Sequence, residues 1–281
     1  MPTFDTPEPI TATIDLTLGA ARISAGDRVA TVVEVRPSDP SNQDDIKAAE
    51  LTRVEYASDN LLIKAPKLRS WLSRSGGGSI DVTVELPAGS QVRGAGGAAD
   101  FHCDGRLGDV RIKTGLGLIR LGQADTLSLK CGLGDISVDR ATGDADVTTG
   151  SGDVRLGELD GSAVIKNSNG DTWVGVAHGD LRVNAANGRI SVDLAHANVV
   201  AKSANGDVRL GEIVRSSAVL ETHLGDLEVG IREGTAAWLD VSATAGKVHN
   251  ALDAADAPEP SAETVEVRAR TSVGDIVIRR P

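Results

Sequence analysis

A repeat of nine residues organises the stretch from Gly134 to Leu210. Each block opens with a small residue, usually Gly followed by Asp, and continues with a short run of β-forming residues, as in GDVRLGELD from Gly152 and GDVRLGEIV from Gly206. Alternate blocks resemble each other more closely than neighbouring blocks do, so the full period is two blocks. A fixed period of this kind is typical of repeat folds, in which one unit buries no core until it stacks on its neighbours.

The pattern inside each block predicts a strand with one buried face. Its third and fifth positions are apolar or small, as at Val154 and Leu156, and the positions between them are mostly polar. Gly and Asn at the block ends tolerate the positive φ of tight turns. Two strands and two corners per coil of two blocks predict an all-β fold, a parallel β-solenoid whose coils stack about 4.8 Å apart. Parallel-crossover chirality favours a right-handed coil.

The repeat predicts three segments. Residues 1–79 lack the nine-residue period and are expected to form a β-rich N-terminal cap, because a solenoid end is an exposed sheet edge. The solenoid proper is expected over residues 80–233, with one residue missing near Thr126 and one extra before Gly225. Residues 234–281 are expected to form a C-terminal cap that continues the solenoid, closed by strands over Val265–Ala269 and Asp275–Ile278.

Alternation and turn signals also predict elements inside the first segment. Ser41 or Asn42 is expected to cap a short helix. The helix is expected over Asp44–Leu51. The expected strands are Ile10–Leu18, Val29–Val35, Asn60–Ile63 and Ile80–Leu86.

Stacking brings residues two blocks apart together, so columns of side chains can be predicted. Asn and Asp at the corners are expected to bond along the stack or to corner backbone groups, which is a structural role. These structural ladders comprise Asn169, Asn187, Asn205, Asp135, Asp153, Asp171 and Asp207. Trp173 is the one outward aromatic residue of the stack, and we interpret it as a surface residue.

One sheet of the predicted solenoid carries lysines together with outward valines, and such a flat face suits the docking of a partner. The residues of this candidate interaction face are Lys113, Lys130, Val164, Lys166, Arg182, Val200 and Lys202. A second candidate contact is the loop that carries Trp71 and Leu72 between basic residues. The structural alternative for the face is that its valines are scattered surface residues, and the alternative for the loop is that Trp71 packs on the cap.

Charge and composition restrict the partners that the chain can take. The net charge is −11 and the pI about 4.9, which argues against nucleic acid and anionic membranes. No apolar stretch long enough to span a membrane and no leader of charged and then apolar residues is present, so we expect no membrane insertion and a cytoplasmic location. Two cysteines do not build a disulfide scaffold, and Cys103 is expected to be a buried thiol.

No catalytic, metal or cofactor site is predicted. The blocks lack the paired Gly and the Asp at position six of the calcium-binding nonapeptide GGxGxDxUx. His178 and His196 stand at equivalent positions of successive coils, with Asp160 one coil earlier, but no fourth metal ligand is evident. No insertion in the regular coils builds a cleft wall, so a carbohydrate-active β-helix enzyme is the least favoured function. No P-loop, HExxH, CxxC or nucleophile elbow is present.

The recurring Gly-Asp-[Ile/Val/Leu] units, the segment Leu86-Pro87-Ala88-Gly89-Ser90 and the run from Val229 to Asp240 support a family resemblance. The chain resembles the bacterial β-strand-repeat family labelled "putative adhesin", a domain of unknown function, and its actinobacterial members in particular. The resemblance extends from about Ile80 onward. It implies a β-solenoid and no catalytic residues.

These observations predict a rigid, non-enzymatic interaction or scaffold protein that binds a protein partner through a flat sheet face. The first alternative is self-association of solenoids end to end, as in bactofilin-like filaments. The second alternative is an exported adhesin.

Overall fold

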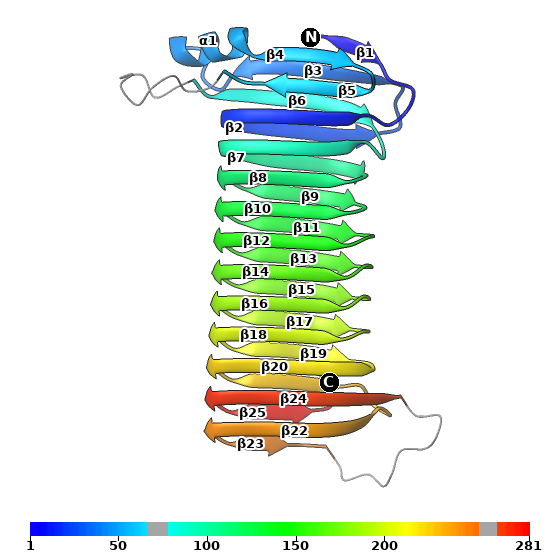
Figure 1. The fold of residues 1–281 in the computed structure, drawn as a ribbon, viewed down its shortest axis with the longest axis vertical. Helices are drawn as coiled ribbons and strands as arrows, with labels where there is room; N and C mark the ends of the chain where they lie inside the picture. Colours follow the sequence, from blue (N-terminus) through cyan, green and yellow to red (C-terminus); the bar gives the residue numbers. More distant parts are fainter. Residues whose placement is uncertain (67–77, 253–262) are drawn as a thin grey trace. The chain divides into compact units, whose positions relative to one another are not determined.

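The computed structural model describes residues 1–66, 78–252 and 263–281, and it divides into two compact units, Met1–Arg140 and Ala141–Pro281. We call them the N-terminal and the C-terminal unit. Each is built from coils whose strands lie in two facing sheets (Figure 1). We call the sheet that carries Lys113, Lys130, Lys166 and Lys202 the lysine sheet of its unit, and the other one the opposite sheet.

In the N-terminal unit, two long strands contribute their first parts to one sheet and their second parts to the other. The lysine sheet contains β4 (Arg53–Ala57), β5 (Asn60–Lys64), the first parts of β2 (Thr11–Gly26) and β7 (Gln91–Leu107), β8 (Val110–Leu116) and β10 (Leu127–Leu133). The opposite sheet contains β1 (Thr3–Asp5), β3 (Ala30–Pro37), β6 (Ile80–Pro87), the second parts of β2 and β7, β9 (Ile119–Ala124) and β11 (Ile136–Ala141), which ends at the unit boundary.

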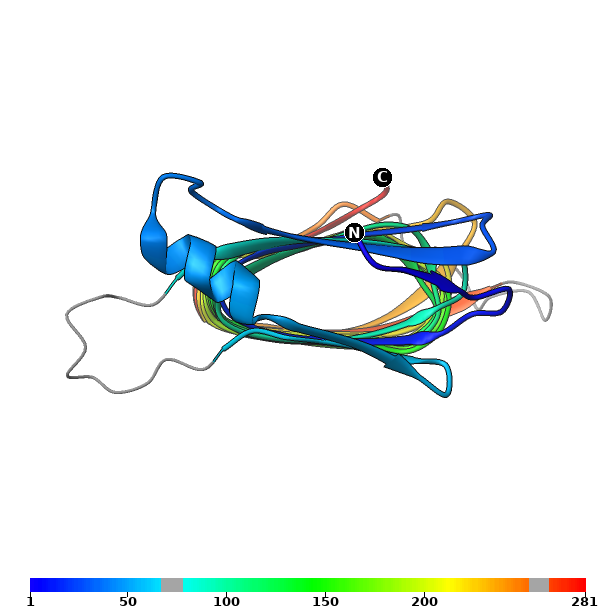
Figure 2. The ribbon, with the colours of Figure 1, turned by 90° about the horizontal axis from the view of Figure 1, so that it is seen from above.

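Antiparallel strands close the first coils of this unit. β3 pairs antiparallel with β6, β1 with β3, and β4 with β5, whereas the coil strands pair parallel. Helix α1 (Gln43–Leu51) begins after Asn42, whose Oδ1 accepts a hydrogen bond from the Asp44 N–H, so the expected Asn42 cap is confirmed. Figure 2, a view along the stack, shows α1 beside a narrow corner of the coils. No helix among the described residues is long and apolar enough to cross a membrane.

The buried carboxylate of Asp45 fixes α1 to this end. Asp45 is 5% exposed, and its two oxygens accept hydrogen bonds from the Asp39 N–H at 3.1 Å and the Ser79 N–H at 2.9 Å. A buried charge is tolerated when several donors hold it, and here both donors are backbone groups. The helix, the segment that follows β3 and the segment that precedes β6 are therefore tied together.

The C-terminal unit is built from regular coils. Its lysine sheet contains, in spatial order, β12 (Ala145–Ser151), β14 (Ala163–Asn169), β16 (Leu181–Asn187), β18 (Val199–Asn205), β20 (Ser216–Leu224), β24 (Thr264–Val273) and β22 (Ala236–Ala245). Its opposite sheet contains β13 (Val154–Leu159), β15 (Thr172–Ala177), β17 (Ile190–Ala195), β19 (Val208–Ile213), β21 (Leu227–Ile231), β25 (Ile276–Arg279) and β23 (Val248–Asn250).

The register confirms the predicted coil length and its two irregularities. Val154 pairs with Thr172, two blocks later, and the regular coils repeat this offset. Lys113 pairs with Lys130, which is one position short of two blocks and corresponds to the predicted missing residue. Val208 pairs with Leu227, which is one position beyond two blocks and corresponds to the predicted extra residue. The all-β parallel solenoid with two strands per coil is therefore the fold, and alternate Val, Leu, Ile and Ala side chains fill its interior.

The last coils do not follow chain order. Val265–Ala269 and Asp275–Ile278 do lie in or beside strands, as expected, but their predicted position at the end of the stack is wrong. β24 pairs with β20 on one edge and with β22 on the other, and β25 lies likewise between β21 and β23. The terminal coil is therefore β22–β23, although it comes earlier in the sequence (Figure 1).

In each unit, buried polar side chains line the inside of one corner of the coils. Each stands three residues before a glycine of positive φ. A donor that reaches a backbone carbonyl oxygen of the preceding coil is found at Thr114, Cys131, Asn167, Ser203, Thr222 and Thr271. Thr222 Oγ1 lies 2.9 Å from Gly206 O, and Asn167 Nδ2 lies 3.1 Å from Gly152 O. These bonds supply donors to corner carbonyl groups that are not used as acceptors in the strand ladders. In the C-terminal unit this column of side chains comprises Thr149, Asn167, Ser203, Thr222 and Thr271, and in the N-terminal unit Thr114 and Cys131 occupy the corresponding positions.

Candidate functional site

The predicted interaction face lies on the lysine sheet of the C-terminal unit, where parallel pairing aligns its residues in two rows. Val164 on β14, Arg182 on β16 and Val200 on β18 occupy directly opposite positions. Lys166 and Lys202 stand two residues further along, with Asn184 between them. Val164 is 36% exposed, and Arg182 and both lysines are exposed. The structure thus brings these five predicted residues together on one flat surface.

Lys113 and Lys130 belong to the N-terminal unit. They are aligned with each other on β8 and β10 and are exposed. The sequence predicts one shared face for them and the lysines of the later coils. The structure shows that each unit has its own set of exposed basic residues on its lysine sheet.

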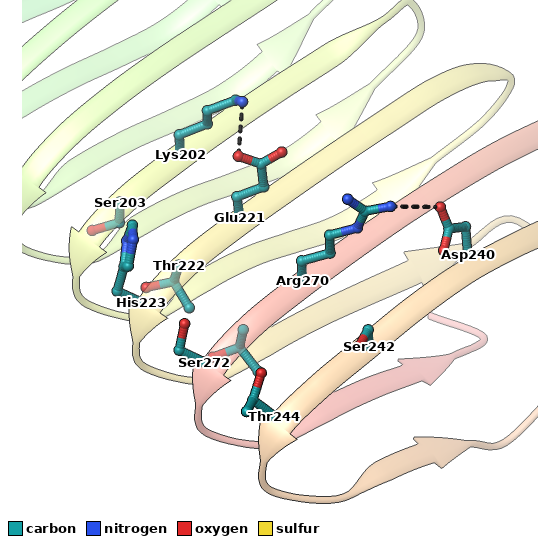
Figure 3. Close-up of a pocket in the computed structure, with 11 residues that line it drawn as sticks. Lys202, Ser203, Glu221, Thr222, His223, Asp240, Ser242, Thr244, Arg270 and Ser272 are labelled. Atoms are coloured by element: carbon teal, nitrogen blue, oxygen red, sulfur yellow. Dashed lines mark hydrogen bonds and ion pairs between the residues drawn. The ribbon is translucent and has the colours of Figure 1, made fainter.

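A shallow polar hollow of about 560 Å³ adjoins Lys202 (Figure 3). Lys202 Nζ forms an ion pair with Glu221 at 2.7 Å, and Arg270 with Asp240 at 3.1 Å. Hydroxyl groups and one imidazole occupy the side of the hollow nearest the corner. The other residues that line it are Ser203, Thr222, His223, Ser242, Thr244, Thr271 and Ser272.

Sequence reasoning missed most of this hollow, because its residues come from strands where the repeat loosens. The alternation of β20 and β24 could have identified Glu221 and Arg270 as outward residues. It could not have placed Arg270 near Glu221, because that neighbourhood depends on β24 lying between β20 and β22. The hollow offers hydrogen-bond donors and acceptors around paired charges, which suits a polar ligand surface better than proton-transfer chemistry.

The Asp residues of the predicted ladder hold the corners of successive coils. Asp153 Oδ1 accepts from the Asp171 N–H at 3.0 Å, and Asp171 Oδ1 accepts from the Arg189 N–H at 2.8 Å. The same bond joins Asp207 to Asp226 at 3.0 Å. Each carboxylate therefore satisfies a backbone donor of the next coil.

The Asn residues form a continuous chain of side-chain bonds along the same corner. Asn187 Nδ2 donates to Asn169 Oδ1 at 2.9 Å, and Asn205 Nδ2 donates to Asn187 Oδ1 at 2.9 Å. In the N-terminal unit, Asp135 follows Gly134, whose φ is +142°, so it stands at the corresponding corner. These contacts support the structural interpretation of both ladders.

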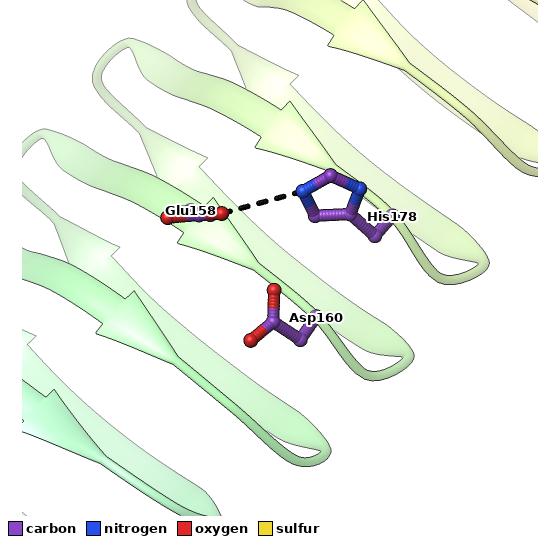
Figure 4. A group of neighbouring side chains, drawn as sticks. All are labelled: Glu158, Asp160 and His178. Atoms are coloured by element: carbon purple, nitrogen blue, oxygen red, sulfur yellow. Dashed lines mark hydrogen bonds and ion pairs between the residues drawn. The ribbon is translucent and has the colours of Figure 1, made fainter.

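One group of side chains has the composition of a metal site. Glu158, Asp160 and His178 each offer a ligand atom, and these atoms lie within 4.8 Å of one another (Figure 4). His178 Nε2 lies 3.3 Å from Glu158 Oε1, and the rings of His178 and His196 stack with centroids 4.9 Å apart. Both carboxylates also take part in other interactions. We assign the group no metal.

The environment of His196 disfavours its charged form. Burial lowers the pKa of His196, and the neighbouring His178, Arg232 and Arg215 lower it further. The lowered pKa favours the neutral imidazole of His196 in its stacked contact with His178.

Other residues that the sequence singled out have simple surroundings. Trp173 is 38% exposed and donates from Nε1 to Asp193 Oδ2 at 3.1 Å. Cys103 is 1% exposed, and burial raises its thiol pKa to about 12, so it is unsuited to nucleophilic chemistry. Trp71 and Leu72 lie outside the described residues.

Comparison with known proteins gives a family but no activity. The chain matches the Toastrack DUF4097 family over residues 22–279. It is similar at 11% identity to solved structures of a "putative adhesin" from Bacteroides fragilis (99% of this chain, 95% of that one, TM-score 0.37) and of another from Parabacteroides merdae (100% and 95%, TM-score 0.44). A "putative cell adhesion protein" from Clostridium sporogenes is also 11% identical (100% and 98%, TM-score 0.24). No curated protein matches the chain.

Proposed function

The chain belongs to the Toastrack DUF4097 family, and we propose that it is a non-enzymatic binding protein that holds a protein partner against the lysine sheet of its C-terminal unit. The observation that carries the proposal is the row formed by Val164, Arg182 and Val200, with Lys166 and Lys202 beside it. Protein interfaces are enriched in Arg and place apolar contacts at the centre of a polar rim.

The backbone supports such a surface well. Every residue of the row is fixed by parallel pairing on both of its strand's edges, and the interior beneath Val164 and Val200 is filled by buried Ile165, Val183 and Ala201. A surface of this kind loses little conformational entropy on binding, because its backbone is already held in place. The exposed side chains alone adjust to the partner.

Site-specific photo-crosslinking in cells of the native host tests the proposal. A photoreactive amino acid at Val164 or Val200 should yield a discrete crosslinked partner. Ser191, on β17 of the opposite sheet, gives the matched control position. Arg182→Glu in the same chain should abolish the crosslink from Val200, because the central cation of the row is reversed.

Crosslinks of equal yield from Ser191 and Val200, or crosslinks that persist in the Arg182→Glu variant, would contradict the proposal. Circular dichroism of each variant checks that the fold is intact. The exported-adhesin alternative differs in location: protease added to intact cells would then remove the protein, whereas the proposed cytoplasmic protein would be spared.

Self-association is a second candidate, favoured by the terminal coil of the C-terminal unit. Trp238 is 70% exposed and Val248 is 42% exposed, while the inward residues Leu239 and Val241 are only half-buried. Among the described residues, the outer edge of β22 has no paired strand. An uncovered edge of this length is a template for pairing with another chain.

Light scattering over a wide concentration range tests this candidate. Growth with concentration that is abolished by Val241→Lys, an inward charge on the open coil, would establish self-association through β22. A monomer at all concentrations would exclude it and leave the lysine sheet as the binding surface.

A further inference from the structure

Four basic side chains form a compact cluster on the lysine sheet of the N-terminal unit. Arg93 lies on β7, Arg111 and Lys113 on β8, and Lys130 on β10, and all four are exposed. Parallel pairing sets Arg93 opposite Arg111 and Lys113 opposite Lys130. Together with Ser128 and backbone of the buried positions, they line an open hollow of about 410 Å³. We call these four residues the basic cluster.

The basic cluster is unusual in this acidic protein because its charges face one another. Like charges directly opposite on neighbouring strands destabilise a sheet. In the C-terminal unit, the cations Lys202 and Arg209 are neutralised by Glu221 and Glu228 on adjacent strands. Within residues 1–66 and 78–140, no carboxylate forms an ion pair with any member of the basic cluster. The cluster therefore presents four uncompensated positive charges on a rigid surface.

We infer that the basic cluster binds an extended acidic segment of a protein partner, with carboxylates at alternate residues. Neighbouring strands are about 4.8 Å apart and alternate residues of one strand about 6.7 Å apart. The four cations therefore form a staggered parallelogram over three strands, and only β8 carries two of them, Arg111 and Lys113. Alternate Asp or Glu side chains of an extended peptide point to one side with that same longer spacing, which matches Arg111 and Lys113. The two guanidinium groups can hold carboxylates through paired hydrogen bonds.

Other polyanions fit this surface less well. The outward positions around the cluster on β7, β8 and β10 carry no aromatic side chain on which bases could stack. The net charge of −11 repels a long nucleic acid or an anionic bilayer, which would extend beyond four cations. A short acidic segment gains the local attraction and experiences less of the overall repulsion. The inference rests on the proposed function, a protein-binding role, and adds the chemistry of one partner segment.

Fluorescence anisotropy with the full chain tests the inference. The probe is a labelled peptide of alternating Glu and Thr. The comparison peptide has the same composition in the repeating order Glu-Glu-Thr-Thr, in which no two Glu residues stand at alternate positions. We expect the alternating peptide to bind more tightly and to weaken as salt is raised. The double variant Arg111→Glu/Lys113→Glu should weaken its binding by about tenfold or more, since both charge-assisted contacts are lost.

A charge-matched control separates the cluster from the overall charge. Arg22→Glu/Arg120→Glu changes the net charge equally, but both residues are on the opposite sheet of the same unit. This variant should bind the alternating peptide within about twofold of the original protein, because its cluster is intact. A second variant, Lys113→Arg/Lys130→Arg, should retain binding because it keeps all four charges.

The outcomes distinguish this inference from the proposed function. Equal binding of the two peptides, equal loss in both double Glu variants, or tighter cluster-dependent binding of duplex DNA or anionic vesicles would overturn the inference. If the crosslinks from Val164 and Val200 persist in Arg111→Glu/Lys113→Glu while no peptide binds, the inference fails and the proposed function stands. If the peptide binds but those crosslinks never form, the cluster is a binding site and the proposed C-terminal surface is wrong.

Discussion

Replacing Thr222 by Val tests whether the buried polar column stabilises the coils. Thr222 is 5% exposed, and its Oγ1 donates to Gly206 O at 2.9 Å. Valine has nearly the same shape but no donor, so the Gly206 carbonyl loses this partner while the packing stays the same. A buried polar group left without its partner costs about 1–3 kcal/mol. With a urea m-value of about 3 kcal/mol/M, reasonable for a chain of this size, the unfolding midpoint should fall by about 0.3–1 M.

The measurement is urea unfolding followed by circular dichroism. Thr148→Val is the matched control, since Thr148 is a half-exposed outward residue one position before Thr149 of the column. Its free energy of unfolding should change by no more than about 0.5 kcal/mol. Thr222→Ser keeps the donor and should recover part of the loss. A Thr222→Val protein with the original midpoint, or a Thr148→Val protein that loses as much, would refute the role assigned to the column.

Three further predictions concern single positions. Ala185 stands in the column between Asn167 and Ser203 without a donor, so Ala185→Thr should raise the free energy of unfolding in urea by about 0.5–1.5 kcal/mol, whereas Ala186→Thr should not. Gly188 has a φ of +129°, and an added Cβ would lie 2.1 Å from Gly170 O, so Gly188→Ala should lower the melting temperature through a loss of at least about 1 kcal/mol. Burial raises the thiol pKa of Cys103 from 9.0 to about 12. As the pH rises, the thiol therefore loses its proton in the unfolded state before it does so in the folded state. The free energy of unfolding should fall between about pH 9 and pH 12, by about 1.4 kcal/mol per pH unit at most. Cys103→Val should flatten that part of a stability–pH curve.

The sequence predicted the coil and its register because both depend on local periodicity. Counting residues between repeats is enough to predict the two irregular coils. One coil, which ends where Lys130 pairs with Lys113, is one residue short, and another, which ends where Leu227 pairs with Val208, is one residue longer. The same counting placed Val164, Arg182 and Val200 in one row, because strand register fixes the position of every side chain on the sheet.

The buried polar column was overlooked, although its signal is present. Thr, Cys, Asn or Ser recurs three residues before the corner glycines, as in Thr149 before Gly152 and Ser203 before Gly206. A polar residue at an inward position reads as a break in the alternation unless the corner carbonyls are considered as acceptors. The basic cluster was also seen only in part: Lys113 and Lys130 were identified, but Arg93 and Arg111 were not, since the early blocks are less regular.

The order of the last coils could not be predicted, because a repeat pattern implies that coils stack in chain order. Energetics favour the observed order. β24 and β25 provide fully buried Val265, Val267, Ile276 and Ile278. The inward positions of β22 include the small residues Ala237 and Ala243, which gain less from burial. Placing β24–β25 inside the stack buries the larger apolar side chains on both sides and leaves the weaker coil at the exposed end.

Engineered disulfides test this order directly. Val219 on β20 is paired with Arg268 on β24, so cysteines at these two positions should form a disulfide under mild oxidation. Asp240 on β22 pairs with Arg268 on the other side, two strand spacings or about 9.6 Å from Val219, which is too far for a disulfide. Cysteines at Val219 and Asp240 should therefore stay reduced, and the buried Cys103 and Cys131 should not interfere. A rapid disulfide between positions 219 and 240, with none between 219 and 268, would show that the coils stack in chain order and that the observed arrangement is wrong.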